Sequence, residues 1–547
     1  MRRWYKHYFF EYQLFRCSER KIRITNGYNN GEYMPIHTTE LKYIGRHLFI
    51  FYLFLYSVCL AFPTAVKIQD TVVDTQAMTL GAGAPYGYAI NGLSFQQEAL
   101  VTFNGWQYAV YYNSSRRVCL ARRQLPSGAW SVIPFTDYTL STTTDAHNVV
   151  TIGICPNDGT IHLSFDHHGG SLHYRVSQPG AASHPDSVVW NAALFGPVRS
   201  YLIAGQTITS VTYPRFWQTP DGNLQFGFRA GASGNGDWYM ADYTADDGLW
   251  SNVRQVINRS GTYTDSLGTS TTRNAYMNPL VYGPDGILHA TWTWRESAGG
   301  ANHDIVYAWS PDGGFHWYNN NVAAGFRIGT GSSPLQTLLS VTWINEGLQL
   351  IGKATGSTTT QQLITVHSSN AAVIAVDRYY GIMNQQAQAV DAQGRIHTIM
   401  FHCTPETYEG YSYSTWGPQG ARRYYHYWRN AKGIWTRNEL PGWVGSRPKL
   451  FIRSNGDAYV IYQSRRNVNP TDTGIYFTDG DLTIQAATAA SSWTDWQIIH
   501  IEPGYFFSEA LADPYRFQDG VLSVVMQESP STIGGASRLR ILDFELN

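Results

Sequence analysis

Histidines are concentrated in residues 142–177 of this 547-residue chain. In the segment "IHLSFDHH", apolar and polar side chains alternate as they do in a strand, which places His167 on the apolar face where the strand ends. His147 precedes the strand before it, so a hairpin through "CPNDGT" brings His147 and His167 to one rim of a sheet. Because imidazole titrates near neutral pH, such a pair suits proton transfer. The structural alternative is that His147 caps a turn and that His167 and His168 are solvated loop residues.

Tyrosine and arginine recur in the next two strand units. Tyr213 and Arg215 come before a glycine turn, and Arg229 ends the strand "LQFGFR" that follows it. In the following unit Tyr276 comes early and Arg295 ends the strand. A guanidinium can bind a carboxylate through two parallel hydrogen bonds, so two arginines on the rim beside the histidines predict an anion site.

Histidine, tyrosine and arginine on one rim suit the β-elimination of a 4-linked uronate. A histidine removes the weakly acidic C5 proton, a tyrosine protonates the leaving oxygen, and arginine with Asn148 neutralises the carboxylate. Hydrolysis calls instead for two carboxylates that flank the bond. Asp145, Asp166 and Asp237 are present, but no spacing singles one of them out. A salt bridge between Arg229 and Asp237 is the structural alternative to an anion site.

The elements that must position these residues are strands, because a turn followed by an alternating strand recurs along the whole body of the chain. The recurring turn glycines are Gly105, Gly159, Gly222, Gly286, Gly347, Gly394, Gly456 and Gly520. This repeat predicts an all-β fold, a single β-propeller with seven blades, with eight as the alternative. Two β-sandwiches are the rival architecture. The segment "SPDGGFHW", which starts at Ser310, resembles an Asp-box turn, a structural motif of propellers.

Charge and composition narrow the class of partner. Charged residues make up 14% of the chain and aromatic residues another 14%, a balance that is common in carbohydrate-handling sheet proteins. The basic excess is confined to residues 1–66, and the rest of the chain is slightly acidic. A body without a basic field is not expected to bind nucleic acid.

Residues 1–66 are expected to be an N-terminal lead with a secretion signal, and 67–547 the catalytic propeller. The stretch 47–66 has no acidic residue, lysine or arginine, and it follows Lys42 and Arg46, as in a signal peptide. We therefore expect a secreted, extracellular protein that has no stable membrane association, unless this segment remains as an uncleaved anchor. Of the three cysteines that follow the signal, Cys119 and Cys155 are the plausible disulfide pair.

Four segments together resemble a known family. They are "YAVYYNSSRRVCLARRQLPSGAWS", "DAHNVVTIGICPNDGTIHLSFDHHGGSLHYRVS", "TYPRFWQTPDGNLQFGFRAGASGNGDWYMADY" and "NHDIVYAWSPDGGFHWYN". They are similar to the BNR-repeat β-propeller polysaccharide lyases, which include ulvan lyases and L-rhamnose-α-1,4-D-glucuronate lyases that act on gum arabic.

The resemblance implies roles for particular residues. It gives His147 and His167 the tasks of abstracting the proton and neutralising the uronate, with His167 favoured as the base, although the adjacent His168 could be the equivalent residue. Tyr213 becomes the candidate acid and Arg229 the carboxylate clamp. Contacts to substrate are expected from Asn148, His168, Arg215, Tyr276 and Arg295.

The resemblance also bears on cofactors and substrate. Catalysis should need no cofactor, but a structural calcium or zinc ion is expected inside the propeller, with His303 and His402 as candidate ligands. The partner should be an acidic plant or algal polysaccharide, with gum arabic-type rhamnosyl-glucuronate first and ulvan as the alternative. The functions of another class that remain open are a sialidase-like hydrolase and a non-catalytic glycan-binding propeller.

Overall fold

The structure is a computed structural model that describes residues 62–320, 327–328, 350–353, 362–368, 371–412, 414–475 and 479–547. Residues 1–61 of the expected lead and secretion signal, which was placed at 1–66, lie outside the described residues, and the predicted turn at Gly347 does too. Ala65 and Val66, at the end of the expected signal, belong to a strand of the propeller. Within the described part of the chain, no helix is both long enough and apolar enough to cross a membrane. Residues 62–547 form one compact unit.

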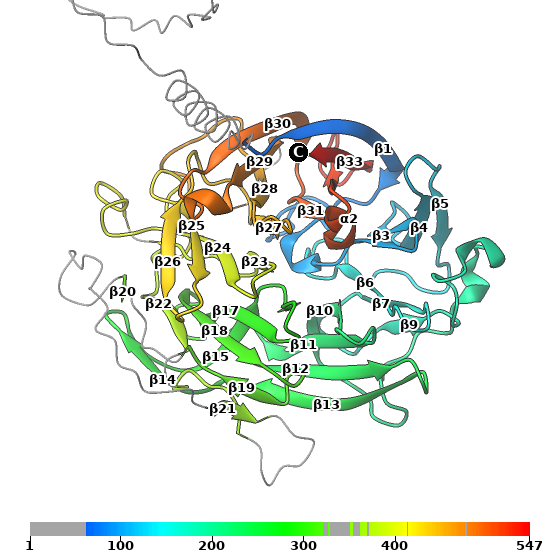
Figure 1. The fold of residues 1–547 in the computed structure, drawn as a ribbon, viewed down its shortest axis with the longest axis horizontal. Helices are drawn as coiled ribbons and strands as arrows, with labels where there is room; N and C mark the ends of the chain where they lie inside the picture. The colour runs from blue at the N-terminus through cyan, green and yellow to red at the C-terminus, as the bar shows by residue number, and fades with distance from the viewer. Residues whose placement is uncertain are drawn as a thin grey trace, which may run out of the picture. The chain divides into compact units, whose positions relative to one another are not determined.

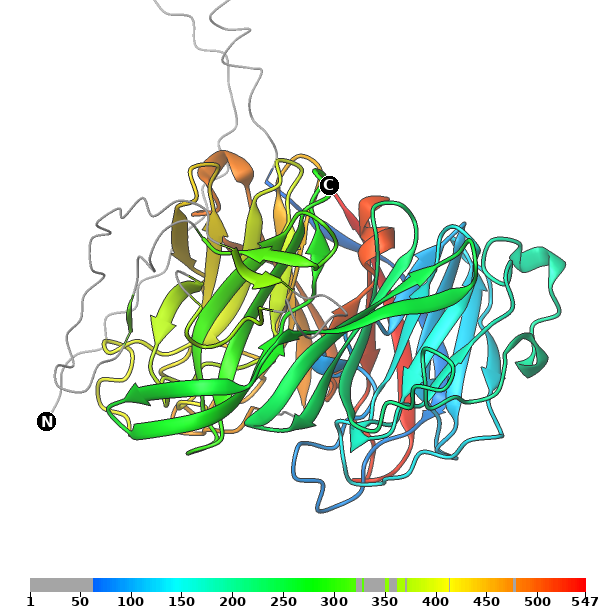
Figure 2. The same ribbon diagram turned by 90° about the horizontal axis from the view of Figure 1, so that it is seen from below.

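This unit is an all-β propeller, as the repeat predicted, with its sheets arranged around a common centre (Figure 1). Seen from the side, many of the strands run between the two faces of the ring (Figure 2). Only short helices interrupt the described strands. They are η1 (Ser94–Gln96), η2 (Pro185–Ser187), η3 (Ala192–Leu194), η4 (Ala489–Ser491) and α2 (Pro514–Gln518).

Most sheets are antiparallel units built from strands that follow one another along the chain. The first contains β2 (Leu100–Phe103), β3 (Trp106–Tyr112), β4 (Val118–Gln124) and β5 (Ser131–Pro134). The second contains β6 (Val150–Ile154), β7 (Ile161–Phe165) and β9 (Tyr174–Val176). The third contains β8 (His168–Gly170), β10 (Val211–Gln218), β11 (Leu224–Ala232), β12 (Asn235–Thr244) and β13 (Leu249–Ile257). The largest contains β14 (Ser260–Asp265), β15 (Gly268–Met277), β16 (Val281–Tyr282), β17 (Leu288–Glu296), β18 (Asn302–Ser310), β19 (His316–Tyr318), β20 (Arg327–Ile328), β21 (Leu350–Lys353) and β22 (Ala372–Val376).

The remaining sheets complete the ring. One contains β23 (Ala387–Val390), β24 (Ile396–His402), β25 (Arg423–Arg429) and β26 (Trp435–Glu439). The next contains β27 (Lys449–Ile452), β28 (Ala458–Ser464), β29 (Gly480–Ala487) and β30 (Gln497–Phe506). The last joins β1 (Ala65–Ala77) to β31 (Leu511–Ala512), β32 (Val521–Gln527) and β33 (Ser537–Leu546). Ala65 pairs with Leu546, so the two ends of the described unit share one sheet and close the ring.

The expected count of seven blades, or of eight, is not confirmed. Six of the described sheets have four or more strands, and the sheet of β6, β7 and β9 has only three. Its chain neighbour β8 pairs instead with β10 of the next sheet, where His168 lies opposite Thr212. The chain after β9 passes through η2 and η3, so no fourth strand is added.

Local sequence signals account for the hairpins. All seven predicted turn glycines within the described residues have positive φ, a conformation that glycine adopts without strain. The Asp-box prediction is also confirmed, because Asp312 accepts a hydrogen bond from the backbone N–H of His316 at 2.8 Å and Trp317 is buried. Cys119 and Cys155 are both free and buried, so the expected disulfide between them is wrong.

Candidate active site

The pairing of β8 with β10 brings the histidine segment beside Tyr213. Within β10, the register shifts between Thr212 and Arg215, and Tyr213 has a φ of 55°. Positive φ is unfavourable for a bulky residue, and such strain is found where a bulge redirects a side chain at a functional site. Asp166, directly after β7, is also in the left-handed region, with a φ of 62°.

His147 and His168 lie against each other and share one carboxylate. Their rings are stacked with centroids 4.0 Å apart. The Nδ1 atoms of both rings lie 2.6 Å from Asp145, one on each carboxylate oxygen. Tyr86 contacts the edge of the His147 ring, and Phe95 stacks against it with centroids 5.2 Å apart. Nε2 of His147 makes no hydrogen bond within the described residues, so it is free to meet a ligand.

Burial sets the charge state of this pair. It lowers the pKa of His147 to about 4, against the opposing effect of the hydrogen bond with Asp145. His147 is therefore neutral near pH 7, with its Nδ1–H directed at Asp145 and Nε2 available as a base. Burial raises the pKa of Asp145, but the hydrogen bonds with His147 and His168 outweigh it and hold that pKa below its usual range.

Arg229 supplies a buried positive charge beside these rings. Its guanidinium carbon lies 4.9 Å from the ring centre of Tyr213 and 5.8 Å from that of Tyr276. The side chain is 2% exposed and forms no ion pair with a carboxylate of the described residues. Asp237, the alternative partner, lies 4.0 Å from Arg259 instead. A buried guanidinium without a carboxylate partner is costly unless an anion binds there.

Tyr276 lies next to Arg229 in a polar corner of the site. Its hydroxyl is 3.0 Å from Oγ of Ser233, and Nη1 of Arg229 donates to it at 3.5 Å. Burial raises the pKa of Tyr276, but the positive charges of Arg229 and Arg295 outweigh it and lower that pKa below its ordinary value. The arrangement combines a neutral imidazole, two tyrosines and an unpaired cation, which suits proton transfer at a carbon atom next to a carboxylate.

The comparisons with known proteins agree with this fold. A model of the BNR repeat-containing family matches residues 106–443, which is more than half of the chain. The chain belongs to the BNR repeat-containing family. The strands from β3 to β26 thus lie in the matched region, which includes every residue of the site described so far except Tyr86 and Phe95.

Several curated relatives of this BNR-repeat chain are ulvan lyases. The long isoform from Alteromonas sp. is 28% identical over 206 residues, which cover 31% of this chain and 20% of that protein. The short isoform from Alteromonas sp. (strain LOR) is 23% identical over 277 residues, 42% of this chain and 51% of that protein. The aligned region thus spans about half or less of the length of these relatives.

Solved structures share the architecture of this BNR-repeat propeller. Polysaccharide lyase Uly1 matches with a TM-score of 0.60 and 17% identity, over 88% of this chain and 99% of that one. A PL25 ulvan lyase bound to -[GlcA(1-4)Rha3S]- matches with a TM-score of 0.55 and 12% identity, over 88% of this chain and 96% of that one. At these identities the likeness shows the fold alone.

The structure corrects the expectation for His167. The ring is completely buried, and its Nε2 accepts a hydrogen bond from the backbone N–H of His173 at 2.8 Å. Burial lowers its pKa well below the ordinary value, with the nearby charge of His173 adding to the effect. A ring held in this way cannot reach a substrate as a base. His168, which is exposed and shares Asp145 with His147, occupies the place that His167 was expected to take.

Arg215 is the second correction, because it holds protein and not substrate. It is buried, and its guanidinium donates to the carbonyl oxygens of Asn278 at 2.6 Å and Met277 at 3.0 Å. These bonds tie β10 to the residues at the end of β15.

Asn148 and Arg295 remain candidates for contact with a ligand. Nδ2 of Asn148 donates to Asp166 at 2.6 Å, but its Oδ1 has no partner among the described residues. Arg295 is half-buried over Trp416, with its guanidinium carbon 5.4 Å from the ring centre.

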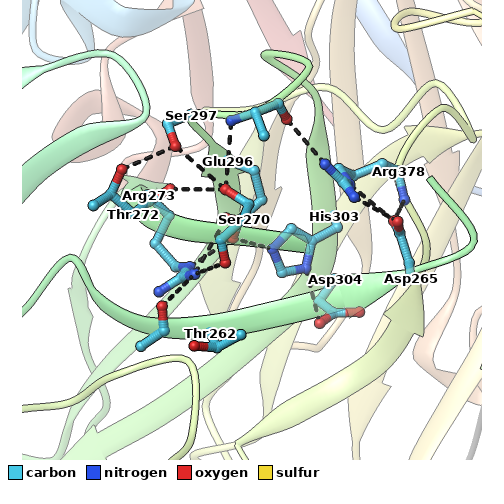
Figure 3. Close-up of polar contacts among 12 residues, drawn as sticks. Thr262, Asp265, Ser270, Thr272, Arg273, Glu296, Ser297, His303, Asp304 and Arg378 are labelled. Carbon is cyan, nitrogen blue, oxygen red and sulfur yellow. Dashed lines mark hydrogen bonds and ion pairs between the residues drawn. The ribbon is translucent and has the colours of Figure 1, made fainter. Parts of the chain in front are cut away.

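The expected metal ligands His303 and His402 lie on different sheets, and each has both ring nitrogens engaged. His303 lies between Glu296, at 2.9 Å, and Asp304, at 3.0 Å (Figure 3). Burial lowers the pKa of His303, but the two carboxylates outweigh it and raise that pKa above the ordinary value, which favours a cation that cannot bind metal. His402 contacts Tyr427 and the carbonyl of Cys403. The two histidines therefore do not form the expected site.

Within the described residues, a different group of side chains has the ligand atoms that a metal ion needs. Asp145, His147 and His168 offer ligand atoms that all lie within 4.8 Å of one another. Two imidazoles and one carboxylate match the ligands of zinc better than those of calcium, which prefers oxygen alone.

Some residues of the site had no useful sequence signal. Tyr86, Phe95 and Ser233 stand outside the alternating pattern and reach the site through long-range packing. Asp145 was visible as one of several acids, but only its position between two imidazoles distinguishes it. The burial of His167, by contrast, follows from its place on the apolar face of its strand.

Proposed function

We propose that this protein is a polysaccharide lyase that cleaves a 4-linked uronate by β-elimination. The observation that carries the proposal is the buried Arg229, which has no carboxylate partner in the described residues and lies beside Tyr213 and Tyr276. A uronate carboxylate supplies the missing negative charge. The nearby His147–Asp145 pair supplies a base with a fixed orientation.

In the proposed reaction Arg229 neutralises the uronate carboxylate, which makes the C5 proton more acidic. Nε2 of neutral His147 takes this proton while Asp145 holds the ring through Nδ1. The electrons of the C5–H bond form the C4–C5 double bond as the C4–O4 bond breaks. The hydroxyl of Tyr213 protonates the leaving oxygen, and Tyr276 orients Arg229 by accepting a hydrogen bond from it.

For the substrate we propose ulvan first and the rhamnosyl-glucuronate of gum arabic second. This reverses the order expected from the sequence, because the curated relatives with matching segments are ulvan lyases. Both candidates are acidic polysaccharides that carry a uronate. We also propose that the protein meets this substrate outside the cell, as the sequence of residues 47–66 suggested.

The site favours elimination over the two alternatives of another class. Both oxygens of Asp145 are occupied by imidazoles, so it is not free to act as one of a hydrolase's two carboxylates. A glycan-binding propeller needs aromatic surface, but has no use for a strained Tyr213 beside an unpaired buried cation.

We further propose that, if the family's structural ion is present, Asp145, His147 and His168 hold it as zinc. A zinc ion there would replace the Nδ1–H of both imidazoles, so His147 would act as the base only in the metal-free protein. Metal analysis of the purified protein, and of protein dialysed against a chelator and then supplied with zinc, tests this. Zinc in a one-to-one ratio that falls in the Asp145→Ala variant supports it, and protein that contains no zinc as purified and does not bind added zinc contradicts it.

The decisive experiment measures ultraviolet absorbance while the protein is incubated with ulvan and, separately, with gum arabic. Elimination leaves an unsaturated uronate that absorbs, whereas hydrolysis does not. Rising absorbance with wild-type protein, lost in Arg229→Ala, supports the lyase and identifies its substrate. New reducing ends without absorbance would mean a hydrolase, and binding of either glycan without any cleavage would mean a lectin.

A further inference from the structure

A cavity of about 570 Å³ lies beside the C-terminal part of β10, whereas the histidine site lies near the start of that strand. Tyr213 lies near the start of β10, whereas the cavity is lined by Phe216, Trp217 and the turn that follows β10. Other walls come from β16, β23, β27 and α2, and α2 lies near the centre of the ring in Figure 1. None of the lining residues belongs to the proposed lyase site. The volume is typical of pockets for small ligands.

The segment around η1 separates this cavity from the lyase site. Phe95 in η1 stacks against His147, whereas Gln97 and Glu98, just after η1, line the cavity. Nζ of Lys449 fastens the segment from β27 by donating to Oγ of Ser94 at 2.8 Å and to its carbonyl at 3.1 Å. The two sites are thus on opposite sides of one anchored turn.

The cavity contains polar groups that are not fully used by the protein. Nε2 of Gln97 is buried and has no partner within the described residues. The carboxylate of Glu98 accepts one side-chain hydrogen bond, from Oγ1 of Thr151 at 3.3 Å. Lys449, in contrast, is occupied by Ser94 and the carbonyl of Gln386, so it is not a free cation for a ligand.

The walls are aromatic and apolar. Nε1 of Trp217 and the hydroxyl of Tyr282 both donate to Oε1 of Gln225 at 2.8 Å, so their polar atoms are already used. What these rings can offer a ligand is their apolar surface. Phe451, Tyr515 and Phe517 add further ring surface. A cavity of this kind favours a flat, largely apolar ligand that has few polar groups.

We propose that this cavity is a second ligand site, for a small ring-bearing molecule that directs one amine or hydroxyl donor at Glu98. The aromatic walls bind the ring, and the carboxylate of Glu98 accepts the donor. An anionic head is disfavoured because it would face the carboxylate of Glu98 while the cation of Lys449 is held by the protein. The site is independent of the proposed lyase reaction.

The charge on Glu98 should decide between amine and anion. Burial raises the pKa of Glu98 to about 7, against the opposing charges of Arg215 and Lys449. Arg215 on β10, Lys449 on β27 and Tyr515 on α2 are the titratable groups whose charges couple to Glu98. Burial also lowers the pKa of Lys449 to about 7, so its positive charge is lost over the same range in which Glu98 becomes ionised. Both changes favour a cationic ligand, and an amine should therefore bind more tightly at pH 8 than at pH 6.

Calorimetric titration of the whole protein with tyramine and with 4-hydroxyphenylacetate tests the proposal, since these probes share a ring and differ in the sign of charge. Tyramine is expected to bind at pH 8, at least about tenfold more tightly than the acid. The preference should shrink at pH 6. Failure of wild-type protein to bind tyramine, or equal binding of both probes at pH 8, would overturn the proposal.

Variants locate the binding. Glu98→Gln keeps the shape of the side chain and should weaken tyramine binding about tenfold at pH 8. Ala389→Leu, which adds bulk to the cavity wall, should weaken both probes, and it serves if Glu98→Gln does not fold. Arg229→Lys, in the other site, should leave tyramine binding unchanged. Binding that survives both cavity variants, or that is lost in Arg229→Lys, places the ligand elsewhere and contradicts the proposal.

Discussion

At the scale of single residues, the most informative group is the guanidinium of Arg229. It lies among the rings of Tyr213 and Tyr276 and forms no ion pair with the described carboxylates. Cation–π contacts stabilise it only partly, by about 2 kcal/mol where the rings are desolvated. An anionic substrate would complete its surroundings, which is why its exact geometry should matter more than its charge.

Arg229→Lys is expected to lower kcat/KM on the uronate polysaccharide by about 100-fold, since an ammonium group cannot replace a bidentate guanidinium. Initial rates of absorbance increase measure the effect. Arg259→Lys is the matched control, because Arg259 is exposed and only loosely paired with Asp237, and it should change the rate less than twofold. Equal losses in the two variants would contradict the assigned role of Arg229.

His147→Ala is expected to reduce kcat/KM by about 1,000-fold, within the range for loss of a general base. Because burial lowers the pKa of His147 to about 4, the base stays neutral down to that pH. The acid limb of kcat/KM should therefore have its midpoint near pH 4, measured in short assays from pH 3.5 to 8. A midpoint at about 6.5, the ordinary value for histidine, argues against His147 as the base.

At the scale of elements, the β14–β15 hairpin positions one wall of the site. Its β15 strand carries Asn274, which accepts from the backbone N–H of Gly234 near the site, and Tyr276. The tip of the hairpin is held by Arg378, which donates to Asp265 from Nε at 2.9 Å and from Nη2 at 2.6 Å (Figure 3). Arg273 and Glu296 form a second buried pair, at 2.6 Å, between β15 and β17.

Arg378→Ala should lower the free energy of unfolding by about 3 kcal/mol, because it leaves Asp265 buried without its cation. The double variant Arg378→Ala with Asp265→Ala should lose less than the sum of the two single variants, with a coupling of at least about 1 kcal/mol. Urea unfolding of the four proteins gives the coupling. Additive losses would show that the ion pair does not hold the hairpin.

At the scale of the whole molecule, stability should fall as the pH drops below about 6.5. Burial lowers the pKa of His162 to about 3, of His289 to about 4 and of His402 to about 3. The unfolded chain binds protons at these histidines below about 6.5, while the folded protein does not until pH 3 to 4, so acid favours unfolding. His303 and Glu98, whose pKa values are raised, oppose this trend, but the buried histidines whose pKa values are lowered outnumber them.

The midpoint of urea unfolding is therefore expected to decrease steadily between pH 7 and pH 5, and His162→Gln should make the decrease shallower. Each buried neutral histidine contributes a loss of about 2 kcal/mol in total between pH 7 and pH 5, and most of this loss occurs below pH 6.5. A midpoint that is constant from pH 7 to pH 5 would contradict the buried, neutral state of these side chains.

Much of the fold followed from local physical chemistry in the sequence. Turn glycines need positive φ and alternating side chains need two faces, and both signals act over a few residues, so the hairpins and the propeller were predictable. The blade count was not, because whether β8 pairs with β7 or with β10 depends on contacts between distant segments. The predicted His147, Tyr213 and Arg229 do meet at one site, but Arg229 does not end its strand as expected, because β11 continues to Ala232. Arg229 pairs with Thr212, the residue before Tyr213, and this pairing brings the two side chains together.

The sequence by itself determined the strands, the turns and the short list of residues that can do chemistry, because those depend on neighbours along the chain. Only the tertiary structure decided which of two adjacent histidines faces the site, that Arg215 and His303 are bound by protein groups, and that Phe95 supports His147. The physical reason is that burial, partners and pKa depend on how side chains pack in space. The partners of Arg215 and His147 come from segments distant in sequence, and those of His167 and His303, although near in sequence, are selected by the packing of the strand ends.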